Sequence, residues 1–514
     1  MLVIDTKKAL VLNTPGHQAI LKIIPHAKTF ELNGTTLTTV PHGVEETKVL
    51  RNLGYKSAPS PILHYYRWPG RHIVPKQHQK DTAAFLTLHK RGLCLNAPGT
   101  GKSLSALWAA DFLMEQGVIS KTLIIAPLST LRPVWTKEIA HHFGHRSFEV
   151  LVGPKKQRLK LLESRPDFAV INHDGFTVMA EYLDEYDLII YDEATAVKTP
   201  SSLRFKTLYR HINKHQPWLW PMTGTPISQN PTDAWALAKL VDSPYIPSSY
   251  TRFKDVVMQK VSQFKWVARP NAVEICKKVL TPSIYYSLDD CVDLPATVFL
   301  DHECNLTAQQ RALFKEMAER ATLSLHDVTA ANAAVVYNKL IHICCGAVYN
   351  NDGDVVEFDA KDRCDTLLEI IEEIGDKVIV FAPLRSVQRL LGKVLTDNKI
   401  DFAIVNGEVS KNDRDQIFHD FQNTNKIQVL LAHPKVAAHG LTLTRAKDII
   451  WYAPIYSLEQ YEQANARIRR LNTANKTRVH HIFATNFEAG MYNRLLQKKL
   501  LLSDLLDLIR GINE

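Results

Sequence analysis

One stretch limits what this chain can fold into more than any other: residues 93–113, LCLNAPGTGKSLSALWAADFL. A short apolar run leads into a loop with two glycines, and a helical pattern follows, so the expected order is strand, loop and helix. Glycines let backbone N–H groups approach a polyphosphate, and the positive end of the helix dipole faces the same anion. The stretch predicts a nucleotide-binding loop, with an ordinary glycine-rich turn as the alternative.

The individual residues of this loop have expected roles in binding ATP and Mg²⁺. Lys102 would reach the β- and γ-phosphates, and the Ser103 hydroxyl would sit on Mg²⁺. Asn96 stands where the usual GxxxxGK[ST] pattern has its first glycine, and the sequence offers no explanation for it. The residues expected to contact ATP are Gln79, Asn96, Ala97, Pro98, Gly99, Thr100, Gly101, Lys102 and Ser103.

A glutamine on the preceding amphipathic segment, residues 76–90, is a candidate for recognising the base. A side-chain amide matches the donor–acceptor edge of adenine. Gln79 is preferred, because Ala83, Phe85 and Leu86 follow it at the expected offsets, and Gln77 is the second choice. The alternative is a solvated glutamine on a helix surface.

Two acidic residues follow a later apolar strand, in the segment YDLIIYDEATAVK, and predict the hydrolytic part of the site. Asp192 would hold Mg²⁺, and Glu193 would orient and deprotonate the attacking water. An isolated Asp-Glu pair is usually a solvated surface pair. Its place at the tip of an apolar strand, downstream of the Gly-Lys-Ser loop, favours the catalytic interpretation.

Two further loops follow apolar strands and are candidates for contacting a polynucleotide or transmitting the nucleotide state to it. In APLSTLRPVWTKEI, a phosphodiester backbone could be contacted by Ser129, Thr130 and Arg132, with a polar helix cap as the alternative. In WLWPMTGTPISQNPTDAWAL, Thr223 and Thr225 would lie beside the site. Taken alone, the second loop would be read as a turn with a threonine cap.

Taken in order, these motifs resemble superfamily-two helicase motors, and specifically their Swi/Snf branch. The resemblance covers about residues 70–500 and rests on PGTGKS, APLSTLRPVWTKEI, DEAT and TGTPISQNPTDAWAL. The DEAH or DEGH box of the family ends here in Thr195, and neither this change nor Asn96 removes a group that hydrolysis requires. The Arg-Arg-x-Lys element of the family is replaced by YYSLDDCVDLP, so no contact is carried over from those arginines.

The resemblance also assigns roles in a second lobe. The family motif QAxxRxxR is matched by QANARIRR, and it implies that Arg467 and Arg470 stabilise charge on the γ-phosphoryl group from the opposite lobe. The spacing of these arginines predicts that they share a helix face, for which a solvated basic face is the alternative. Gln463, Gly440 and Thr442 would contact nucleic acid or nucleotide.

The expected fold class is α/β, with two tandem RecA-like parallel lobes, a helical insertion between them and a small N-terminal α/β accessory domain. The accessory domain is expected at 1–65, lobe 1 at 66–245, the helical protrusion and linker at 246–345, and lobe 2 at 346–514. Short strands and helices should alternate in the accessory domain.

Composition adds limits on partners and location. The net charge is 62 − 53 = +9 and favours a polyanionic partner, although a merely basic enzyme would also fit. Seven cysteines without a CxxC pair argue against zinc and for a reducing compartment. We expect no signal peptide, no membrane partner and a cytoplasmic location. The resemblance to the Swi/Snf branch further implies a DNA-associated protein of compact prokaryotic or phage type.

Three functions remain open at this point. The first is a Swi/Snf-like motor that couples ATP hydrolysis to translocation on duplex or branched DNA in replication, recombination or repair. The second is a strand-separating DNA or RNA helicase. The third is a non-motor scaffold that binds nucleic acid. The residues that argue against it are the intact Lys102, Asp192, Glu193, Arg467 and Arg470. Protein partners, polarity and oligomeric state are not encoded in any recognisable pattern.

Overall fold

The computed structural model describes residues 1–13, 16–69, 74–227, 230–261, 266–291, 297–324, 330–349, 355–437, 443–468 and 477–497. The chain divides into two units. Unit 1 comprises Met1–Pro226, Trp235–Ile246 and Lys278–Cys291. Unit 2 comprises Ile227–Ala234, Pro247–Lys277 and Val292–Glu514. No helix in the described ranges is long and apolar enough to cross a membrane.

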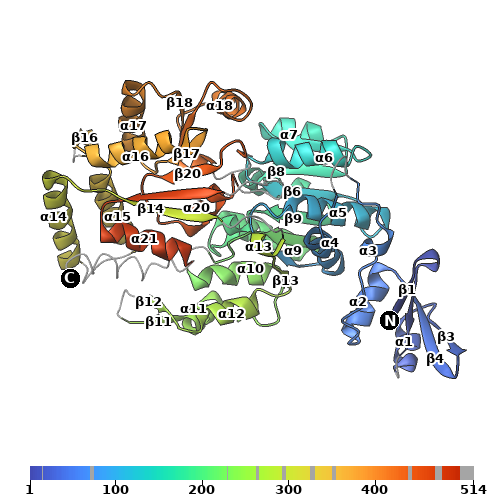
Figure 1. Cartoon of the computed structure of the whole chain (residues 1–514). Helices are drawn as coiled ribbons and strands as arrows, with labels where there is room; N and C mark the ends of the chain where they lie inside the picture. Colours follow the sequence, from blue (N-terminus) through green and yellow to red (C-terminus); the bar gives the residue numbers. More distant parts are fainter. Residues whose placement is uncertain are drawn as a thin grey trace. The chain divides into compact units, whose positions relative to one another are not determined.

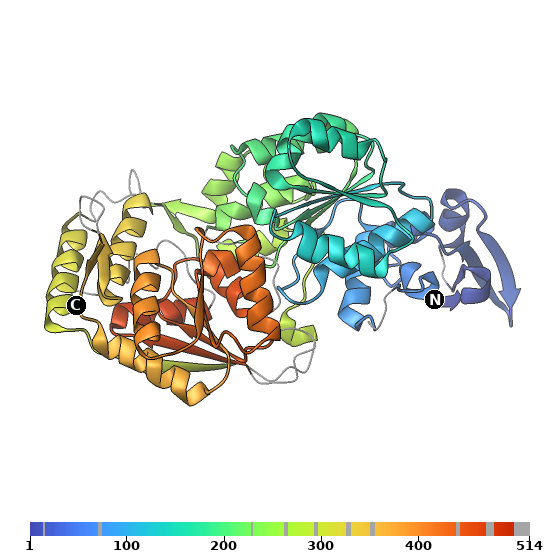
Figure 2. The same ribbon diagram turned by 90° about the horizontal axis from the view of Figure 1, so that it is seen from above.

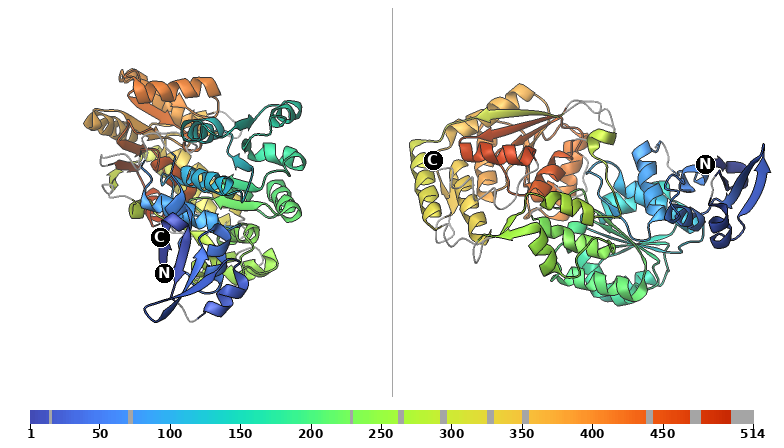
Figure 3. Two further views of the ribbon diagram at one scale, coloured as in Figure 1. Left: turned by 90° about the vertical axis from the view of Figure 1, so that its right-hand side faces the viewer. Right: turned by 90° about the horizontal axis from the view of Figure 1, so that it is seen from below.

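Unit 1 begins with a four-stranded antiparallel sheet in the order β1-β2-β4-β3, which Figure 3 shows in dark blue, apart from the larger sheet of the unit. Its own core contains Leu10, Ile20, Val40 and Leu50. The predicted accessory α/β domain is therefore confirmed. Its elements are β1 Leu2–Ile4, β2 Ala9–Leu12, α1 His17–Ile23, β3 Lys28–Leu32, β4 Thr35–Pro41 and α2 Val44–Asn52.

The main body of unit 1 is a seven-stranded parallel sheet in the order β13-β5-β10-β9-β6-β8-β7. Its central strands are fully buried and rich in Ile and Leu, as expected for a sheet covered on both faces. Figure 2 shows helices on both sides of these strands. The strands are β5 Leu93–Cys94, β6 Thr122–Ala126, β7 Phe148–Leu151, β8 Phe168–Asn172, β9 Leu188–Asp192, β10 Trp218–Met222 and β13 Ser283–Ile284.

The helices of unit 1 connect these strands. Helix α5 is buried along most of its length, from Leu104 to Met114, because it packs in the centre of the unit. The helices are α3 Ile62–Tyr65, α4 Gln77–Leu88, α5 Lys102–Glu115, α6 Lys137–His142, α7 Lys155–Leu162, α8 His173–Met179, α9 Leu203–His215, α10 Ala234–Leu240, whose first residue belongs to unit 2, and α13 Leu288–Cys291.

Unit 2 is built on a six-stranded parallel sheet in the order β14-β21-β20-β17-β19-β18. Figure 1 shows the yellow β14 beside the red strands at one edge of this sheet. The strands are β14 Val298–Glu303, β17 Val378–Phe381, β18 Phe402–Val405, β19 Val429–Ala432, β20 Asp448–Trp451 and β21 Arg478–Phe483. The two α/β lobes predicted from the sequence are thus both present.

The remaining elements of unit 2 are helices and two small hairpins. The hairpins are β11 Met258–Lys260 with β12 Trp266–Ala268, and β15 Ala347–Tyr349 with β16 Val355–Glu357. The helices are α11 Tyr250–Val257, α12 Ala272–Val279, which runs into unit 1, α14 Ala308–Ser324, α15 Ala330–Cys344, α16 Lys361–Ile374, α17 Arg385–Asp397, α18 Lys411–Asn423, α19 Pro434–Ala437, α20 Leu458–Asn465 and α21 Asn486–Leu496.

Segment 246–345 differs from the expected helical insertion, because it also contributes a strand to each large sheet. The Leu95 N–H donates to the Ile284 carbonyl at 2.8 Å, so β13 covers the edge of the short strand β5. Strand β14 likewise pairs along its length with β21. Both contacts satisfy backbone groups that a sheet edge would otherwise expose.

A buried arginine ties the core of unit 2 together. The Arg363 guanidinium is 1% exposed and forms an ion pair with Glu488 at 2.7 Å. It also donates to the carbonyl oxygens of Cys344, Tyr452 and Ile482. Arg363 therefore links α16, the end of α15, β21, α21 and the segment after β20 through one side chain.

Candidate nucleotide site

The phosphate loop follows β5 directly and ends where α5 begins, as the sequence predicts. Gly99 and Gly101 both have φ 84°, a left-handed backbone that favours glycine. A Cβ on Gly101 would collide with the side-chain nitrogen of Gln79. The backbone angle at this position therefore favours glycine, and the side chain of Gln79 packs directly on it.

Lys102 lies in the first turn of α5 with its ammonium turned back over the loop. Its Nζ donates to the carbonyl oxygens of Asn96 at 2.7 Å and Ala97 at 3.2 Å. Next to it, the Ala97 N–H donates to the Tyr286 carbonyl at 2.8 Å, which extends the pairing with β13 into the loop. Backbone groups thus fix the first half of the loop and hold the ammonium at its centre.

The registers of three parallel strands bring the loop, the acidic pair and the TGTP segment to one level. Met222 is paired with Cys94 on one side and with Asp192 on the other. Since neighbouring strands lie about 4.8 Å apart, Cys94 and Asp192 are separated by roughly 10 Å across β10. The carboxyl edge of a parallel sheet is where ligands of α/β folds bind.

Asp192 is buried and held by N–H donors. Its carboxylate accepts from the indole of Trp135 at 3.0 Å and from the Glu193 N–H at 3.0 Å, and its carbonyl oxygen is bonded to His173 at 2.9 Å. Burial raises the pKa of Asp192, while nearby Lys102 and the Trp135 and Glu193 donors oppose that shift. A buried carboxylate of this kind is stabilised by a cation.

Glu193 follows with φ 49°, which is uncommon for a residue with a side chain. Backbone strain of this kind costs on the order of 1–3 kcal/mol and is concentrated at functional sites. The sharp turn separates Glu193 from the strand that carries Asp192. Strand β9 therefore ends at Asp192, and Glu193 is the first residue beyond it.

The segment at 223–226 lies against the phosphate loop. The Thr223 N–H donates to the Cys94 carbonyl at 3.0 Å, and a Cβ on Gly224 would lie 2.7 Å from Pro98 Cδ. Thr223 and Thr225 are both buried, and the Thr223 hydroxyl accepts from the Thr225 N–H. Both threonines therefore lie beside the loop, with the Thr223 hydroxyl engaged in the turn.

Gln79 lies next to the loop, whereas Gln77 does not. Gln79 is 5% exposed; its Oε1 accepts from the Lys76 N–H at 3.0 Å, and its Nε2 lies 3.5 Å from the Thr100 carbonyl. Gln77 instead donates to Asp81 on the exposed surface of α4. The structure thus brings the preferred candidate to the loop.

The loop after β6 contains two exposed candidates and one buried one. Ser129 and Arg132 are exposed. Thr130 is buried, and its hydroxyl donates to the Pro127 carbonyl at 2.9 Å, so it closes a turn. Thr130 precedes the helical turn Leu131–Thr136, but its hydroxyl makes no cap hydrogen bond to that turn.

In unit 2 the predicted shared helix face is wrong for Arg467. Helix α20 ends at Asn465, whose side chain accepts from the Trp451 indole at 2.9 Å, and Arg467 lies in the turn beyond it. Arg467 is 8% exposed and Gln463 is 5% exposed. Gly440, Thr442 and Arg470 lie outside the described residues.

One other group in the described ranges has the donor types of a metal site: Asp111, Glu115 and His145. Asp111 already accepts hydrogen bonds from Tyr66 at 2.7 Å, from His145 at 2.9 Å and from Arg146 at 2.6 Å. A metal would have to displace the arginine from this buried carboxylate. The group is accordingly a structural ion pair.

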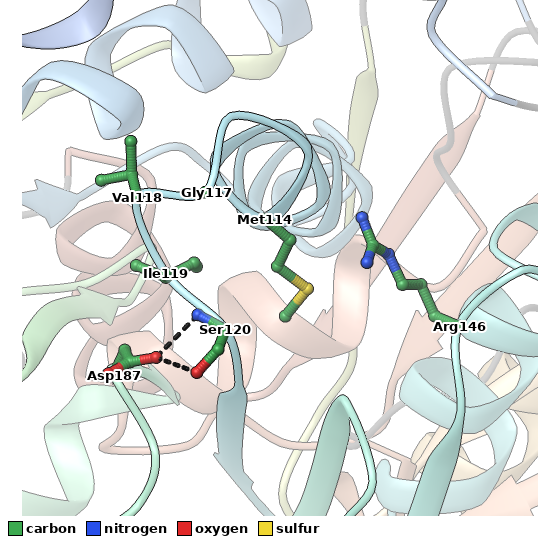
Figure 4. Close-up of a pocket in the computed structure, with 7 residues that line it drawn as sticks. All are labelled: Met114, Gly117, Val118, Ile119, Ser120, Arg146 and Asp187. Atoms are coloured by element: carbon green, nitrogen blue, oxygen red, sulfur yellow. Dashed lines mark hydrogen bonds between the residues drawn. The ribbon is translucent and has the colours of Figure 1, made fainter.

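A pocket at the opposite, amino-terminal edge of the sheet is separate from the nucleotide site (Figure 4). There the carboxylate of Asp187 accepts from the N–H and hydroxyl of Ser120. The residues that line this pocket are Met114, Gly117, Val118, Ile119, Ser120, Arg146 and Asp187. Ser120 precedes β6, Arg146 precedes β7 and Asp187 precedes β9, so the pocket lies at the end of the sheet opposite the phosphate loop.

Sequence reasoning missed several residues that support the site. Trp135 was visible only as a letter of the motif APLSTLRPVW, and His173 as one of the polar residues that end β8. Nothing in the pattern pairs either one with Asp192, because those contacts are made by distant segments. The same holds for His78, which contacts the Thr100 carbonyl at 3.0 Å.

Comparisons with known proteins place these segments in described families. The SNF2-related domain matches residues 78–345, and the helicase conserved C-terminal domain matches residues 362–472. An uncharacterized ATP-dependent helicase of Mycoplasma genitalium is 24% identical over 77% of this chain, which spans 38% of that protein. The putative protein p41 of Acyrthosiphon pisum secondary endosymbiont phage 1 is 25% identical over 80% of this chain and 93% of its own length.

A solved structure is also similar: the SWI2/SNF2 ATPase core of Sulfolobus solfataricus in complex with dsDNA. It is 22% identical, with 83% of this chain and 91% of that chain covered and a TM-score of 0.39.

Proposed function

The chain belongs to the SNF2-related domain family, and from this we propose that it is an ATP-dependent motor that translocates on duplex or branched DNA. The observation that carries the proposal is the common register of Cys94, Met222 and Asp192. It brings a phosphate loop, an acidic pair and a coupling segment to one sheet edge. Hydrolysis of a nucleoside triphosphate requires the phosphate loop and the acidic pair, and a motor also requires the coupling segment.

Within unit 1, each residue of the site has a proposed task. Lys102 exchanges two carbonyl partners for phosphate oxygens, which are stronger acceptors because they are charged. Ser103 and Asp192 hold Mg²⁺, which when bound neutralises charge on the β- and γ-phosphates. Glu193 orients the attacking water and takes its proton. Gln79 contacts the adenine.

Unit 2 is proposed to supply the remaining charge. Arg467 and Arg470 stabilise the transferring γ-phosphoryl group, as the family motif implies. Gln463, Gly440 and Thr442 are proposed to contact nucleic acid or nucleotide. The buried position of Arg467 supports a role at a closed site better than a role as a solvated surface residue.

DNA is the proposed track. The net charge of +9 favours a polyanion, and Ser129 and Arg132 are exposed where a backbone phosphate could reach them. Contacts to the phosphate backbone make such binding independent of sequence and sensitive to salt. A role in replication, recombination or repair is the corresponding biological proposal, with the protein acting in the cytoplasm on DNA.

A strand-separating helicase is the second candidate. The observation that favours it is the Mycoplasma genitalium relative, which is described as an ATP-dependent helicase. A strand-displacement assay separates the candidates, because a motor that tracks duplex DNA hydrolyses ATP without releasing a strand. RNA is proposed as the less favoured polynucleotide.

The Glu193→Gln variant tests the proposed chemistry. Glutamine keeps the size of the side chain but cannot take a proton, so ATP and DNA should stay bound while hydrolysis falls by a factor of about 100 or more. Filter binding of radiolabelled ATP on DNA, followed by a turnover assay, measures both properties. The matched control is Lys102→Ala, which should lose ATP binding as well. Normal turnover by Glu193→Gln would remove Glu193 as the base.

A further inference from the structure

Asn96, the residue that departs from the usual phosphate-loop pattern, joins the loop to α4. Its Nδ2 donates to the Thr82 hydroxyl at 2.8 Å, and that hydroxyl donates to the His78 carbonyl at 2.7 Å. Both Asn96 and Thr82 are buried, at 1% and 0% exposure. A short chain of hydrogen bonds therefore runs from the start of the loop into the second turn of the helix.

The orientation of the Asn96 amide follows from its partner. The Thr82 hydroxyl has one proton, which is used on the His78 carbonyl, so Thr82 must accept from Asn96. This leaves Asn96 Oδ1 buried and without a hydrogen-bond partner among the described residues. The amide of Asn96 is thus oriented by its bond to Thr82 and is not free to turn over.

A second bond from the same helix reaches the other end of the loop. His78 Nε2 lies 3.0 Å from the Thr100 carbonyl oxygen, so the ring nitrogen is the donor. Together, the Asn96 and His78 contacts hold the loop at both ends against one face of α4. Gln79 lies between His78 and Thr82 along α4, and its side chain lies over Gly101. Helix and loop thus form a single packed body.

We propose that Asn96 is a positioning residue that locks α4 onto the phosphate loop, so that the contact of Gln79 to the base and the contacts of the loop to the phosphates form together. The inference rests on the proposed function as an ATP-dependent motor. Two parts of one ligand bind most tightly when the two parts of the site are already held in register. Glycine at this position would supply no side chain to make the link.

The proposal predicts that loosening the link weakens binding of a whole nucleotide but not of its phosphates alone. In Asn96→Ala and in Thr82→Val, we expect the Kd and KM for ATP to rise about tenfold, with kcat within about twofold. Binding of inorganic tripolyphosphate, which can contact only the loop, should change by less than about twofold. Displacement of a fluorescent ATP analogue measures both ligands without requiring hydrolysis.

The double variant adds a test of the link itself. Because either substitution alone removes the same hydrogen bond, Asn96→Ala with Thr82→Val should bind ATP no more weakly than the worse single variant. The matched control is Thr87→Val, which removes another buried hydroxyl of α4 that donates to the Ala84 carbonyl, away from the loop. It should bind ATP as the unchanged protein does.

The possible outcomes are distinct. Unchanged ATP affinity in Asn96→Ala would overturn the inference. If that variant does not fold, unchanged ATP affinity in Thr82→Val would do the same. Equal weakening of ATP binding and of tripolyphosphate binding would also overturn the inference. It would show that the loop itself is distorted, not that the loop and α4 have lost their alignment. If the unchanged protein bound no ATP at all, the proposed function would fail with it, whereas failure of the inference alone leaves the unchanged protein binding ATP normally.

Discussion

At the scale of single residues, the site depends on donors supplied by segments far apart in the sequence. Asp192 accepts from Trp135, which lies 57 positions earlier. The strand, the acidic pair and the loop were predictable, because each is a local pattern of apolar, acidic or glycine residues. The partners Trp135, His173 and Thr82 were not, since nothing in a local pattern tells which buried side chains meet.

The contact between Trp135 and Asp192 gives the first residue-scale prediction. Trp135→Phe keeps an aromatic ring in the core but removes the indole donor from a carboxylate. A hydrogen bond to a charged group contributes about 1.5–3 kcal/mol, so kcat/KM for ATP should fall at least tenfold at limiting Mg²⁺. Steady-state hydrolysis across a magnesium titration measures the effect.

Trp108→Phe is the matched control for this prediction. Trp108 is also fully buried and donates from its indole to a backbone carbonyl, that of Pro69 at 2.8 Å, so both variants lose a ring and a bond. Only Trp135 touches Asp192. Equal losses of activity in the two variants would show that the effect is one of core packing.

At the scale of elements, most strands and helices agree with the sequence patterns, and the exceptions have physical causes. Strand β13 has only two residues, Ser283 and Ile284, and forms because it covers the edge of β5. Its pairing is a tertiary effect that no local pattern encodes. Helix α20 ends at Asn465, before the helix face expected to carry Arg467, and the asparagine side chain bonds there to Trp451.

The Arg363–Glu488 pair carries the stability prediction for the elements it joins. Arg363→Met leaves a buried carboxylate without its cation and three carbonyls without their donor. Breaking a buried pair from one side costs about 3–5 kcal/mol, so the free energy of unfolding should fall by that amount. Urea unfolding followed by circular dichroism measures it.

The control for this prediction is an exposed ion pair in the same unit. Lys393→Met breaks the 2.9 Å contact between Lys393 and Glu357. The side chains of these two residues are 64% and 40% exposed, respectively. Exposed pairs contribute about 0–1 kcal/mol, so this variant should remain close to the unchanged protein. An equally small effect of Arg363→Met would contradict the structural role given to Arg363.

A buried histidine is expected to make the stability of the six-stranded sheet of unit 2 depend on pH. His481 on β21 bonds to Asp301 at 3.0 Å and to Tyr461 at 2.7 Å. Burial lowers its pKa to about 4, although the contact with Asp301 acts in the opposite direction. The unfolded chain, with a histidine pKa of about 6.5, then binds more protons than the folded one. Stability from His481 is full above about pH 6.5 and is lost as the pH falls toward 4.

His481→Phe should therefore lose less stability than the unchanged protein between pH 7 and pH 5. Urea unfolding at both pH values provides the comparison. His419→Phe is the control, because His419 is 63% exposed on α18 and its replacement removes a histidine without touching the buried contacts of His481. Identical pH dependence in all three proteins would argue against the buried neutral state of His481.

At the scale of the whole molecule, one chain contains two α/β units. The family match spans both of them, and the phage relative is matched over 93% of its length. Two lobes and their order were predictable from the resemblance to a known motor family, and the accessory domain from its alternating short strands and helices. The choice of DNA as the track follows from charge and family, and it is the central claim to be tested.

The most direct test is the rate of ATP hydrolysis with a panel of nucleic acids: blunt duplex, forked and four-way DNA, single-stranded DNA and RNA. We predict strong stimulation by duplex or branched DNA, weakening steeply as salt rises because phosphate contacts release counterions. Lys102→Ala should abolish hydrolysis with every nucleic acid while keeping the fold, as judged by circular dichroism. Stimulation by RNA alone, or no hydrolysis with any of these nucleic acids, would contradict the account.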